Sequence, residues 1–355
     1  MGEVFAATSW AEMVSPSPTG VDFEGLLVLV GVQVAQESLS GVSALFALLV
    51  GEVAAQAYPS KPIRFIVPFP PGGGADTSAR IVGERLAKSL GQQVIIENRP
   101  GADGNIGTDA IAKATPDGYT IGIAATGPVT VGRKLFSNLG YDPDKDLAAI
   151  AHLYEAPLLL VVHPGVEAKS IGELIGAARA QPGKFNIAVS TIGSAQHYLS
   201  EMLKLGTGAK IQSIPYKGGA QAVADVVGGR VEMAWAVVPA VQAFLASGKL
   251  KALAISSPAR STLLPDVPTM VEAGFPSVVA TSWNGVIGPA GIPRDVLARL
   301  NAEINQAVKD PEVERRFAGL GLVPLTGGVA DVEAFVRADS ERWARVVKEA
   351  NLKPE

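Results

Sequence analysis

Between residues 62 and 355, short apolar runs alternate with segments of helical periodicity, and this alternation constrains the fold more than any other feature of the sequence. Ile63–Pro68 is a short apolar run that ends in proline and glycine, which is typical of a buried strand. Thr77–Leu90 follows with apolar residues at helical spacing and ends before Gly91. Further strands are predicted at Val94–Ile96, Tyr119–Ala124, Ala149–Leu153, Leu158–Val162, Asn186–Val189, Lys210–Ile214, Glu232–Val237, Lys251–Ile255 and Gly285–Ile287. Further helices are predicted at Gly107–Ala114, Ile171–Ala180, Ala195–Leu205, Ala220–Val227, Val238–Ser247, Arg294–Lys309, Pro311–Gly319 and Val332–Ala350.

This alternation favours an α/β fold whose sheets are covered by helices on both faces. The predicted strands are more numerous than one small sheet needs, and 355 residues are enough for two domains that each bury a core. The sequence therefore predicts two α/β lobes. The last two long helices carry apolar stripes, which indicate packing against the core rather than a binding surface.

Charge and composition exclude several classes of protein. The net charge is −4 and there is no extended run of lysine or arginine, so a nucleic-acid-binding protein is not expected. The absence of cysteine excludes disulfides, thiol nucleophiles and cysteine-ligated metals. His152, His163 and His197 are too scattered for a histidine-rich metal site, and the HExxH spacing is absent. We expect neither a metal nor a cofactor.

Residues 1–57 differ from the rest of the chain, because they contain six acidic residues and no lysine or arginine. Their apolar stretches, Leu26–Val32 and Val42–Val50, are shorter than the roughly 18 residues of a membrane-spanning helix. The second stretch leads to Ala55-Gln56-Ala57, a small-x-small pattern typical of signal-peptidase sites. We expect an atypical leader, a secretory signal that ends at Ala57 but lacks the usual basic start. The alternative is a disordered or wrongly assigned extension.

The most distinctive segment is the loop from Pro68 to Thr77, which contains three consecutive glycines between a predicted strand and a predicted helix. Glycines let a ligand approach the backbone closely, and the free amides at a helix start favour an anion. A phosphate loop is excluded because no Gly-Lys-Ser/Thr follows, and the GxGxxG spacing of dinucleotide sites is also absent. The alternative is a tight turn with Asp76 as the N-cap.

Three further loops repeat this arrangement at the ends of predicted strands: Ala124–Pro128, Ser190–His197 and Pro215–Ala220. Lys217 could neutralise an anion or could be an ordinary surface charge. Ser194 and His197 could suggest a hydrolase, but GxSxG is absent and no acidic residue is obviously placed to orient the histidine. Together the four loops predict a binding site for a small anion rather than a catalytic site.

The chain resembles the substrate-binding proteins of tripartite tricarboxylate transporters, the Bug-type family. The resemblance begins with PFPPGGGADTSARIVGERLAKSLGQQVIIENRPGADGNIGTDAIAKATPDGYTI and continues through STIGSAQHYLSEML, IPYKGGAQAVADVVGGRVEM, SSPARSTLLPDVPTMVEAG and SWNGVIGPAGIP. It covers residues 58–355. It implies a periplasmic, two-lobed Venus-flytrap fold of type II, with lobe one at 58–158 plus 282–355 and lobe two at 159–281.

The resemblance also implies a function and a set of binding residues. The expected protein captures a small organic carboxylate between its lobes and delivers it to membrane permease subunits; it is a monomer and not an enzyme. Carried over by position, the binding residues are Phe69, Gly73, Gly74, Ala75, Asp76, Thr126, Gly127, Ser190, Thr191, Gly193, Ser194, His197, Tyr216, Lys217 and Trp235.

One departure from the family pattern concerns the far end of the ligand. Many relatives carry an aromatic residue followed by aspartate where this chain has Trp235-Ala236. Without that aspartate, a ligand with an apolar or aromatic far end is expected rather than one with a cationic end.

Three alternative functions remain open from the sequence. The bound state could be presented to a membrane signalling partner, as in a ligand-sensing adaptor. Ser194 and His197 could act as a hydrolase. An effector domain of a DNA-binding regulator would share a two-lobed fold, but no helix-turn-helix precedes residue 58.

Overall fold

The computed structural model of the chain describes residues 58–136 and 139–352. The expected leader at 1–57, with its cleavage site after Ala57, lies outside these described residues. Within them, no helix combines the length and apolar character that a membrane crossing needs.

Ten strands are present among the described residues. Their bounds are β1 Ile63–Val67, β2 Val94–Asn98, β3 Thr120–Ala125, β4 Leu147–Val162, β5 Asn186–Val189, β6 Gln212–Pro215, β7 Met233–Val237, β8 Lys251–Ile255, β9 Thr281–Pro289 and β10 Val323–Pro324. They are hydrogen-bonded in the order β2-β1-β3-β9-β4-β7-β5-β6, and β8 and β10 also pair with β4. The pairs within β1–β3 and within β5–β7 are parallel, whereas every pair that involves β4 or β9 is antiparallel.

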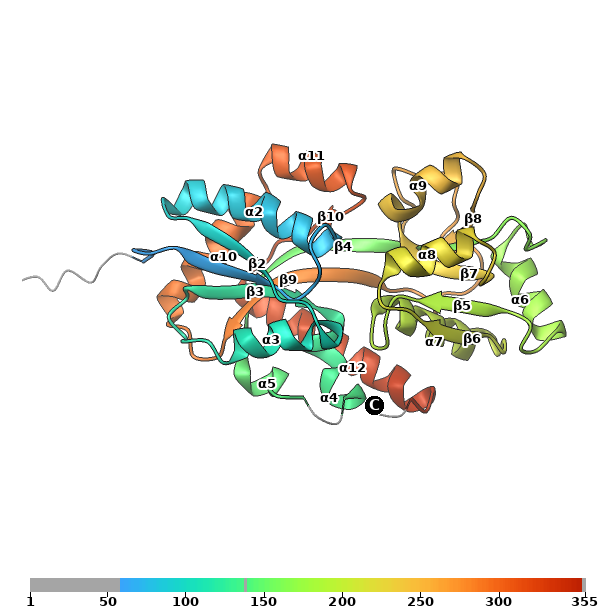
Figure 1. Cartoon of the computed structure of the whole chain (residues 1–355), viewed down its shortest axis with the longest axis horizontal. Helices are drawn as coiled ribbons and strands as arrows, with labels where there is room; N and C mark the ends of the chain where they lie inside the picture. The colour runs from blue at the N-terminus through green and yellow to red at the C-terminus, as the bar shows by residue number, and fades with distance from the viewer. Residues whose placement is uncertain (1–57, 137–138, 353–355) are drawn as a thin grey trace, which may run out of the picture. The chain divides into compact units, whose positions relative to one another are not determined.

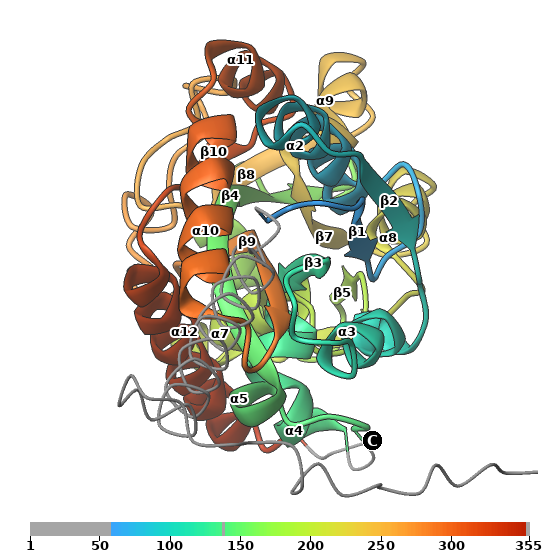
Figure 2. The same ribbon diagram turned by 90° about the vertical axis from the view of Figure 1, so that its left-hand side faces the viewer.

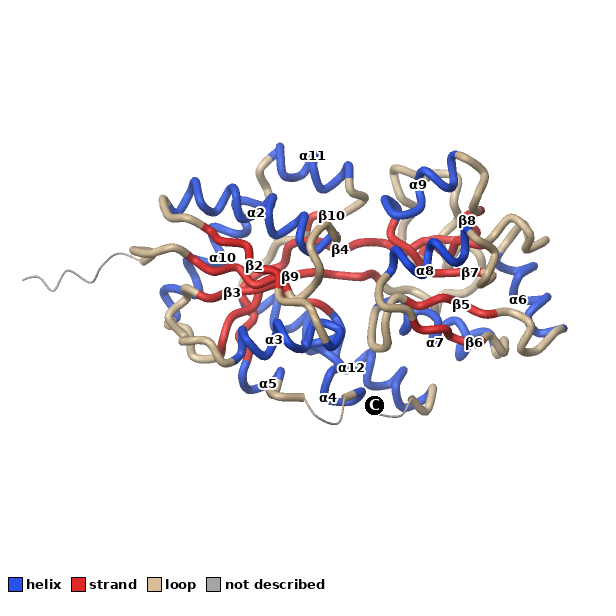
Figure 3. The backbone as a smooth tube through the Cα atoms, in the orientation of Figure 1, coloured by secondary structure: helices blue, strands red, loops and turns tan. Residues whose placement is uncertain are grey.

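Helices cover both faces of this sheet system (Figures 1 and 3). Their bounds are α2 Gly74–Leu90, α3 Asn105–Ala112, α4 Gly132–Leu135, α5 Pro143–Asp146, α6 Ile171–Ala180, α7 Ala195–Thr207, α8 Gly219–Val227, α9 Val238–Ala246, α10 Arg294–Val308, α11 Pro311–Gly319 and α12 Val329–Glu349, with short helical turns η1 Ala102–Gly104 and η2 Gly127–Val131. Alternate residues of a strand face different helices. Phe65 packs with α2 and α10, whereas Ile66 packs with α3; Trp235 packs with α6 and α7, whereas Ala236 packs with α8 and α9. The predicted α/β class is therefore confirmed.

Strand β4 differs from its prediction. The sequence predicts two strands, Ala149–Leu153 and Leu158–Val162, but the structure has one strand of 16 residues. Pro157 is accommodated because it stands where β4 changes partner: Pro157 is in register with Thr281 of β9, and Leu158 is in register with Val237 of β7.

This change of partner divides the strands into two groups. Up to Pro157, β4 pairs with β9 and β10, and through β9 with β3, β1 and β2. From Leu158 onward it pairs with β7 and β8, and through β7 with β5 and β6. Figure 3 shows β4 running from one group of strands into the other. Among the described strands, β4 alone is paired to both groups.

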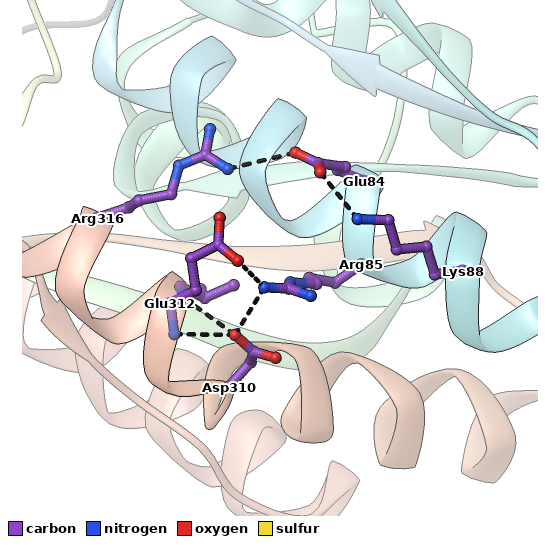
Figure 4. Close-up of polar contacts among 7 residues, drawn as sticks. Glu84, Arg85, Lys88, Asp310, Glu312 and Arg316 are labelled. Atoms are coloured by element: carbon purple, nitrogen blue, oxygen red, sulfur yellow. Dashed lines mark hydrogen bonds and ion pairs between the residues drawn. The ribbon is translucent and has the colours of Figure 1, made fainter.

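Ion pairs fasten helix α11 to helix α2 (Figure 4). Arg85 of α2 lies 3.1 Å from Asp310, the N-cap of α11, and also contacts Glu312. Glu84 pairs with Arg316 of α11 at 3.3 Å. Each pair is partly exposed and adds little by itself, but several together fix the two helices side by side.

Helix α12 joins the two groups of strands through buried aromatic side chains. The indole N–H groups of Trp283 in β9 and Trp343 in α12 donate to Asp339 Oδ2, at 2.9 and 3.0 Å. Trp343 stacks on Tyr198 of α7, with ring centroids 4.2 Å apart. Figure 2 shows α12 beside α7 and α10. Burial raises the pKa of the Asp339 carboxyl despite its hydrogen bonds and the nearby Arg342.

We expect Asp339→Ala to lower the free energy of unfolding by about 2–3 kcal/mol, because two buried indole N–H groups lose their acceptor. Urea unfolding followed by circular dichroism measures this change. Glu341→Ala is the matched control, since Glu341 is an exposed acid of the same helix. Equal effects of the two substitutions would contradict this role of Asp339.

Candidate functional site

The first and second predicted loops meet at a glycine that the sequence analysis missed. Gly104 has φ +94°, and a Cβ atom added to it would lie 3.2 Å from Phe69 Cε1 and 3.0 Å from Pro128 Cγ. Phe69 belongs to the loop after β1, and Pro128 follows Gly127 in the loop after β3. Gly104 therefore lets these two loops approach closely.

The second, third and fourth loops also approach one another closely in turn. A Cβ atom added to Gly127 would lie 3.4 Å from the carbonyl oxygen of Gly193. A Cβ atom added to Gly219 would lie 3.9 Å from Cβ of Ser190. The contacts thus run from the loop after β1, through the loops after β3 and β5, to the loop after β6. They include loops from both groups of strands.

In the first loop, Gly73 and not Asp76 is the N-cap, so the N-cap interpretation of Asp76 was wrong. Helix α2 begins at Gly74, and Gly73 has extended backbone angles of φ −78° and ψ 171°. Asp76 lies in the first turn and reaches back to accept the Gly72 amide at 2.9 Å. Gly72, with φ +85°, makes the turn that brings this amide to the carboxylate.

Two further groups hold the Asp76 carboxylate, which is 4% exposed. Arg80 Nε donates to it at 3.0 Å, and Asn98 Nδ2 donates to Oδ1 at 3.0 Å. Burial acts to raise the pKa of Asp76, but the hydrogen bonds from Arg80, Gly72 and Asn98 outweigh it and hold the pKa below its usual value. Asp76 therefore shapes the loop, and its charge is matched by Arg80.

In the second loop, the Thr126 hydroxyl is buried without a hydrogen-bond partner among the described residues. Its side chain belongs to a residue that is 4% exposed. The Thr126 carbonyl accepts the Thr130 hydroxyl at 2.6 Å, so the carbonyl has a partner while the side-chain hydroxyl has none among the described residues. A buried hydroxyl left unpaired in a native fold indicates a position where water or a ligand binds.

In the third loop, Ser194 is the N-cap of α7. Its Oγ accepts the His197 amide at 3.2 Å and donates to the Thr191 carbonyl at 2.7 Å. Gly193, with φ +80°, donates its amide to His197 Nδ1 at 3.2 Å. These bonds give the loop one fixed shape at the start of the helix.

His197 has an acidic neighbour that the sequence analysis did not identify. Glu201, one turn further along α7, places Oε1 3.4 Å from His197 Nε2. Glu201 also lies 2.6 Å from Lys204, and these partners hold the pKa of the carboxyl below its usual value against the effect of burial. Because His197 Nδ1 accepts an amide and Ser194 Oγ donates to a carbonyl, the two side chains do not form a nucleophile–base pair here.

In the fourth loop, the Tyr216 hydroxyl donates to Asp225 Oδ2 at 2.9 Å, and Lys217 is exposed. Ser190 of the third loop donates to Gln196 at 3.0 Å. Trp235, in the middle of β7, is 2% exposed, and its indole nitrogen has no partner among the described residues.

A groove elsewhere on the surface has a volume of about 490 Å³. It lies at the junction of α10 and α11 and is lined by Ala302, Asn305, Gln306, Lys309, Asp310 and Pro311. None of the predicted binding residues lines it.

The geometry of Asp76 predicts a pH-dependent contribution to stability. We expect Asp76→Asn to lower the free energy of unfolding at pH 7 by roughly 1–2 kcal/mol. Because the folded pKa lies below the unfolded value of about 3.9, the contribution is present above that pH and is lost as the pH falls through the folded pKa. Urea unfolding between pH 2 and pH 7 measures it. Asp295→Asn, an exposed acid in the first turn of α10, is the control and should show a smaller, flatter difference.

Comparisons with known sequences identify relatives of this chain. A family model described as the tripartite tricarboxylate transporter family receptor matches residues 78–352. Protein BugT of Bordetella pertussis is 40% identical over 329 residues, which cover 92% of this chain and 98% of BugT.

Solved structures show the same fold. An R. palustris protein solved with adipate has a TM-score of 0.78 and 32% identity, covering 84% of this chain and all of that chain. MatC from Rhodopseudomonas palustris, solved with bound malate, has a TM-score of 0.74 and 31% identity, covering 82% and 100%. The shared fold is that of the type II periplasmic binding proteins. The chain therefore belongs to the tripartite tricarboxylate transporter receptor family, the Bug-type periplasmic solute-binding proteins.

Proposed function

We propose that this chain captures a small organic carboxylate at the four contacting loops and delivers it to the permease subunits of a tripartite tricarboxylate-type transporter without changing it chemically. The observation that carries this proposal is the close approach of Gly127 to Gly193, which brings the start of η2 beside the loop before α7. A ligand bound at this position would touch loops that belong to both groups of strands. The adipate and malate bound by structural relatives support the choice of a carboxylate.

The starts of α2 and α7 supply the chemistry for an anion. Both helices are long, with 17 and 13 residues, and the amides of a first turn lack partners within the helix. The helix dipole adds partial positive charge at the same place. The buried Thr126 hydroxyl lies next to Gly127 and has a hydrogen bond to give. The proposed binding residues are Phe69, Gly73, Gly74, Ala75, Asp76, Thr126, Gly127, Ser190, Thr191, Gly193, Ser194, His197, Tyr216, Lys217 and Trp235.

We place lobe one at residues 58–158 and 282–355 and lobe two at 159–281. The change of partner along β4 between Pro157 and Leu158 supports this division, as does the start of β9 at Thr281. A hinge at these strands would let the lobes close on a ligand and open to release it. Helix α12 contacts α7 through the stacked Trp343 and Tyr198. Movement of the two lobes would therefore be coupled to this aromatic stack.

We further propose that the protein acts in the periplasm as a monomer after its leader is removed at Ala57, as expected for its family. For the ligand, we propose an acid without an ammonium group at its far end. Ala236 supplies no carboxylate to pair with such a group, and Ala236 is 4% exposed among the apolar side chains of α8 and α9.

The first test is a thermal-shift screen of the full chain, unfolded and refolded beforehand to remove any carried-over ligand. The panel contains mono-, di- and tricarboxylates, aromatic acids and amino acids. A ligand that binds only the folded state must raise the melting temperature, and at 100 times its Kd it adds about 2.7 kcal/mol. We expect a simple carboxylic acid to give the largest shift. A response to none of these acids would reject the proposed function, and a best response to an amino acid would reject the inference from Ala236.

The second test concerns Thr126. We expect Thr126→Val to weaken binding of the best acid roughly tenfold, because the ligand loses a hydrogen bond. The stability without ligand should stay within about 0.5 kcal/mol, since the hydroxyl has no partner to lose. Isothermal titration and urea unfolding measure the two quantities.

Thr207→Val is the matched control. The Thr207 hydroxyl contacts the Leu203 carbonyl and accepts the Ala209 amide at 3.3 Å, at the far end of α7. This substitution should therefore lower stability and leave affinity unchanged. The same pattern for both variants would show that Thr126 has no special part in binding.

A further inference from the structure

A polar pair is buried between the two central strands of the first group. Tyr154 of β4 and Asn284 of β9 are in register, and the Tyr154 hydroxyl donates to Asn284 Oδ1. The two residues are 3% and 7% exposed. Tyr154 also makes an edge-to-face contact with Phe317, with centroids 5.6 Å apart, which fixes its ring.

Asn284 extends this pair to the second loop. Its Nδ2 donates to the Ala124 carbonyl at 2.8 Å. Ala124 lies near the end of β3, two residues before Thr126. The position of the Thr126 hydroxyl is therefore linked through the backbone to the amide of Asn284.

Tyr154 extends the pair to the first loop. A Cβ atom added to Gly74, the first residue of α2, would lie 3.6 Å from the Tyr154 hydroxyl oxygen. The fully buried Ser78, one turn further along α2, interacts with the same hydroxyl. The Tyr154 hydroxyl thus lies beside the first turn of α2, the helix whose amides face the first loop.

A buried polar pair is costly unless every group is satisfied, and an apolar pair of similar size would fill the same space. The polar pair adds a defined geometry, because its hydrogen bonds fix the distance between the elements that they join. Here those elements are the first turn of α2 and the end of β3. These elements carry the two lobe-one loops of the candidate site.

We propose that Tyr154 and Asn284 are positioning residues that hold the start of α2 and the Thr126 loop at a fixed separation, so that the carboxylate site is formed before the ligand binds. This inference rests on the proposed function. Neither residue needs to touch the ligand. Their effect on affinity comes from pre-organisation, since a site that is already ordered loses less entropy on binding.

The test compares Tyr154→Phe with wild type in the full chain. Amide hydrogen exchange of the unliganded protein should become faster in the peptides covering 72–82 and 122–131 together. The Kd for the best acid from the thermal-shift screen should rise roughly tenfold, as expected for one lost hydrogen bond. A merely structural role would lower the melting temperature without singling out these two segments.

Tyr58→Phe is the matched control. The Tyr58 hydroxyl donates to the Gly118 carbonyl at 2.7 Å, before the opposite end of β3, and its loss should change neither segment nor the affinity. If Tyr154→Phe does not fold, Asn284→Ala replaces it, with faster exchange expected in the same two segments.

The inference and the proposed function fail in different ways. Unchanged exchange in the two segments, or a change in only one of them, would overturn the positioning role even if the wild type binds an acid. If the wild type binds no acid, the proposed function fails. The exchange measurement then decides alone whether the pair holds the two loops.

Discussion

The continuity of strand β4 is the constraint on which the other features of the structure depend. One strand of 16 residues pairs first with β9 and then with β7, and the change occurs between Pro157 and Leu158. Because one continuous strand runs through both groups of strands, it joins them at a defined point while each group keeps its own helices. The carboxyl ends of the parallel strands then bring loops from both groups together, as the approach of Gly127 to Gly193 shows.

The loops themselves are shaped chiefly by hydrogen bonds among their own residues. Asp76 accepts the Gly72 amide, and His197 accepts the Gly193 amide, so in each loop a side chain in the first turn of a helix fixes the preceding glycine. Both glycines have positive φ, which side-chain-bearing residues adopt only with strain. Asp76 and His197, polar residues that could be mistaken for catalytic groups, therefore hold backbone amides in place. Thr126 differs from them because its hydroxyl remains unpaired among the described residues.

Part of the candidate site could be predicted from the sequence, since glycine and hydroxyl residues after apolar runs are a local pattern. Glu201 was overlooked although the sequence could have identified it, because it lies four residues after His197 in a predicted helix and that spacing places both side chains on one face. The other residues that support the loops could not be predicted. The role of Gly104 depends on Phe69 and Pro128, which are distant in sequence. Tyr154 and Asn284 are separated by 130 residues and meet only in the register of β4 and β9. The contacts of Gly104, Tyr154 and Asn284 are set by strand order, which hydrophobic periodicity does not encode.

The sequence by itself determined the α/β class, most helices, the glycine-rich starts of α2 and α7, and the absence of cysteine chemistry. These follow from local periodicity and from residue chemistry, which act over a few residues. The tertiary structure decided that Ala149–Leu153 and Leu158–Val162 form one strand, that Gly73 rather than Asp76 caps α2, and that α12 packs on α7 through Trp343. These depend on which strands pair and which side chains are buried together, and both are fixed only when segments far apart in the chain come into contact.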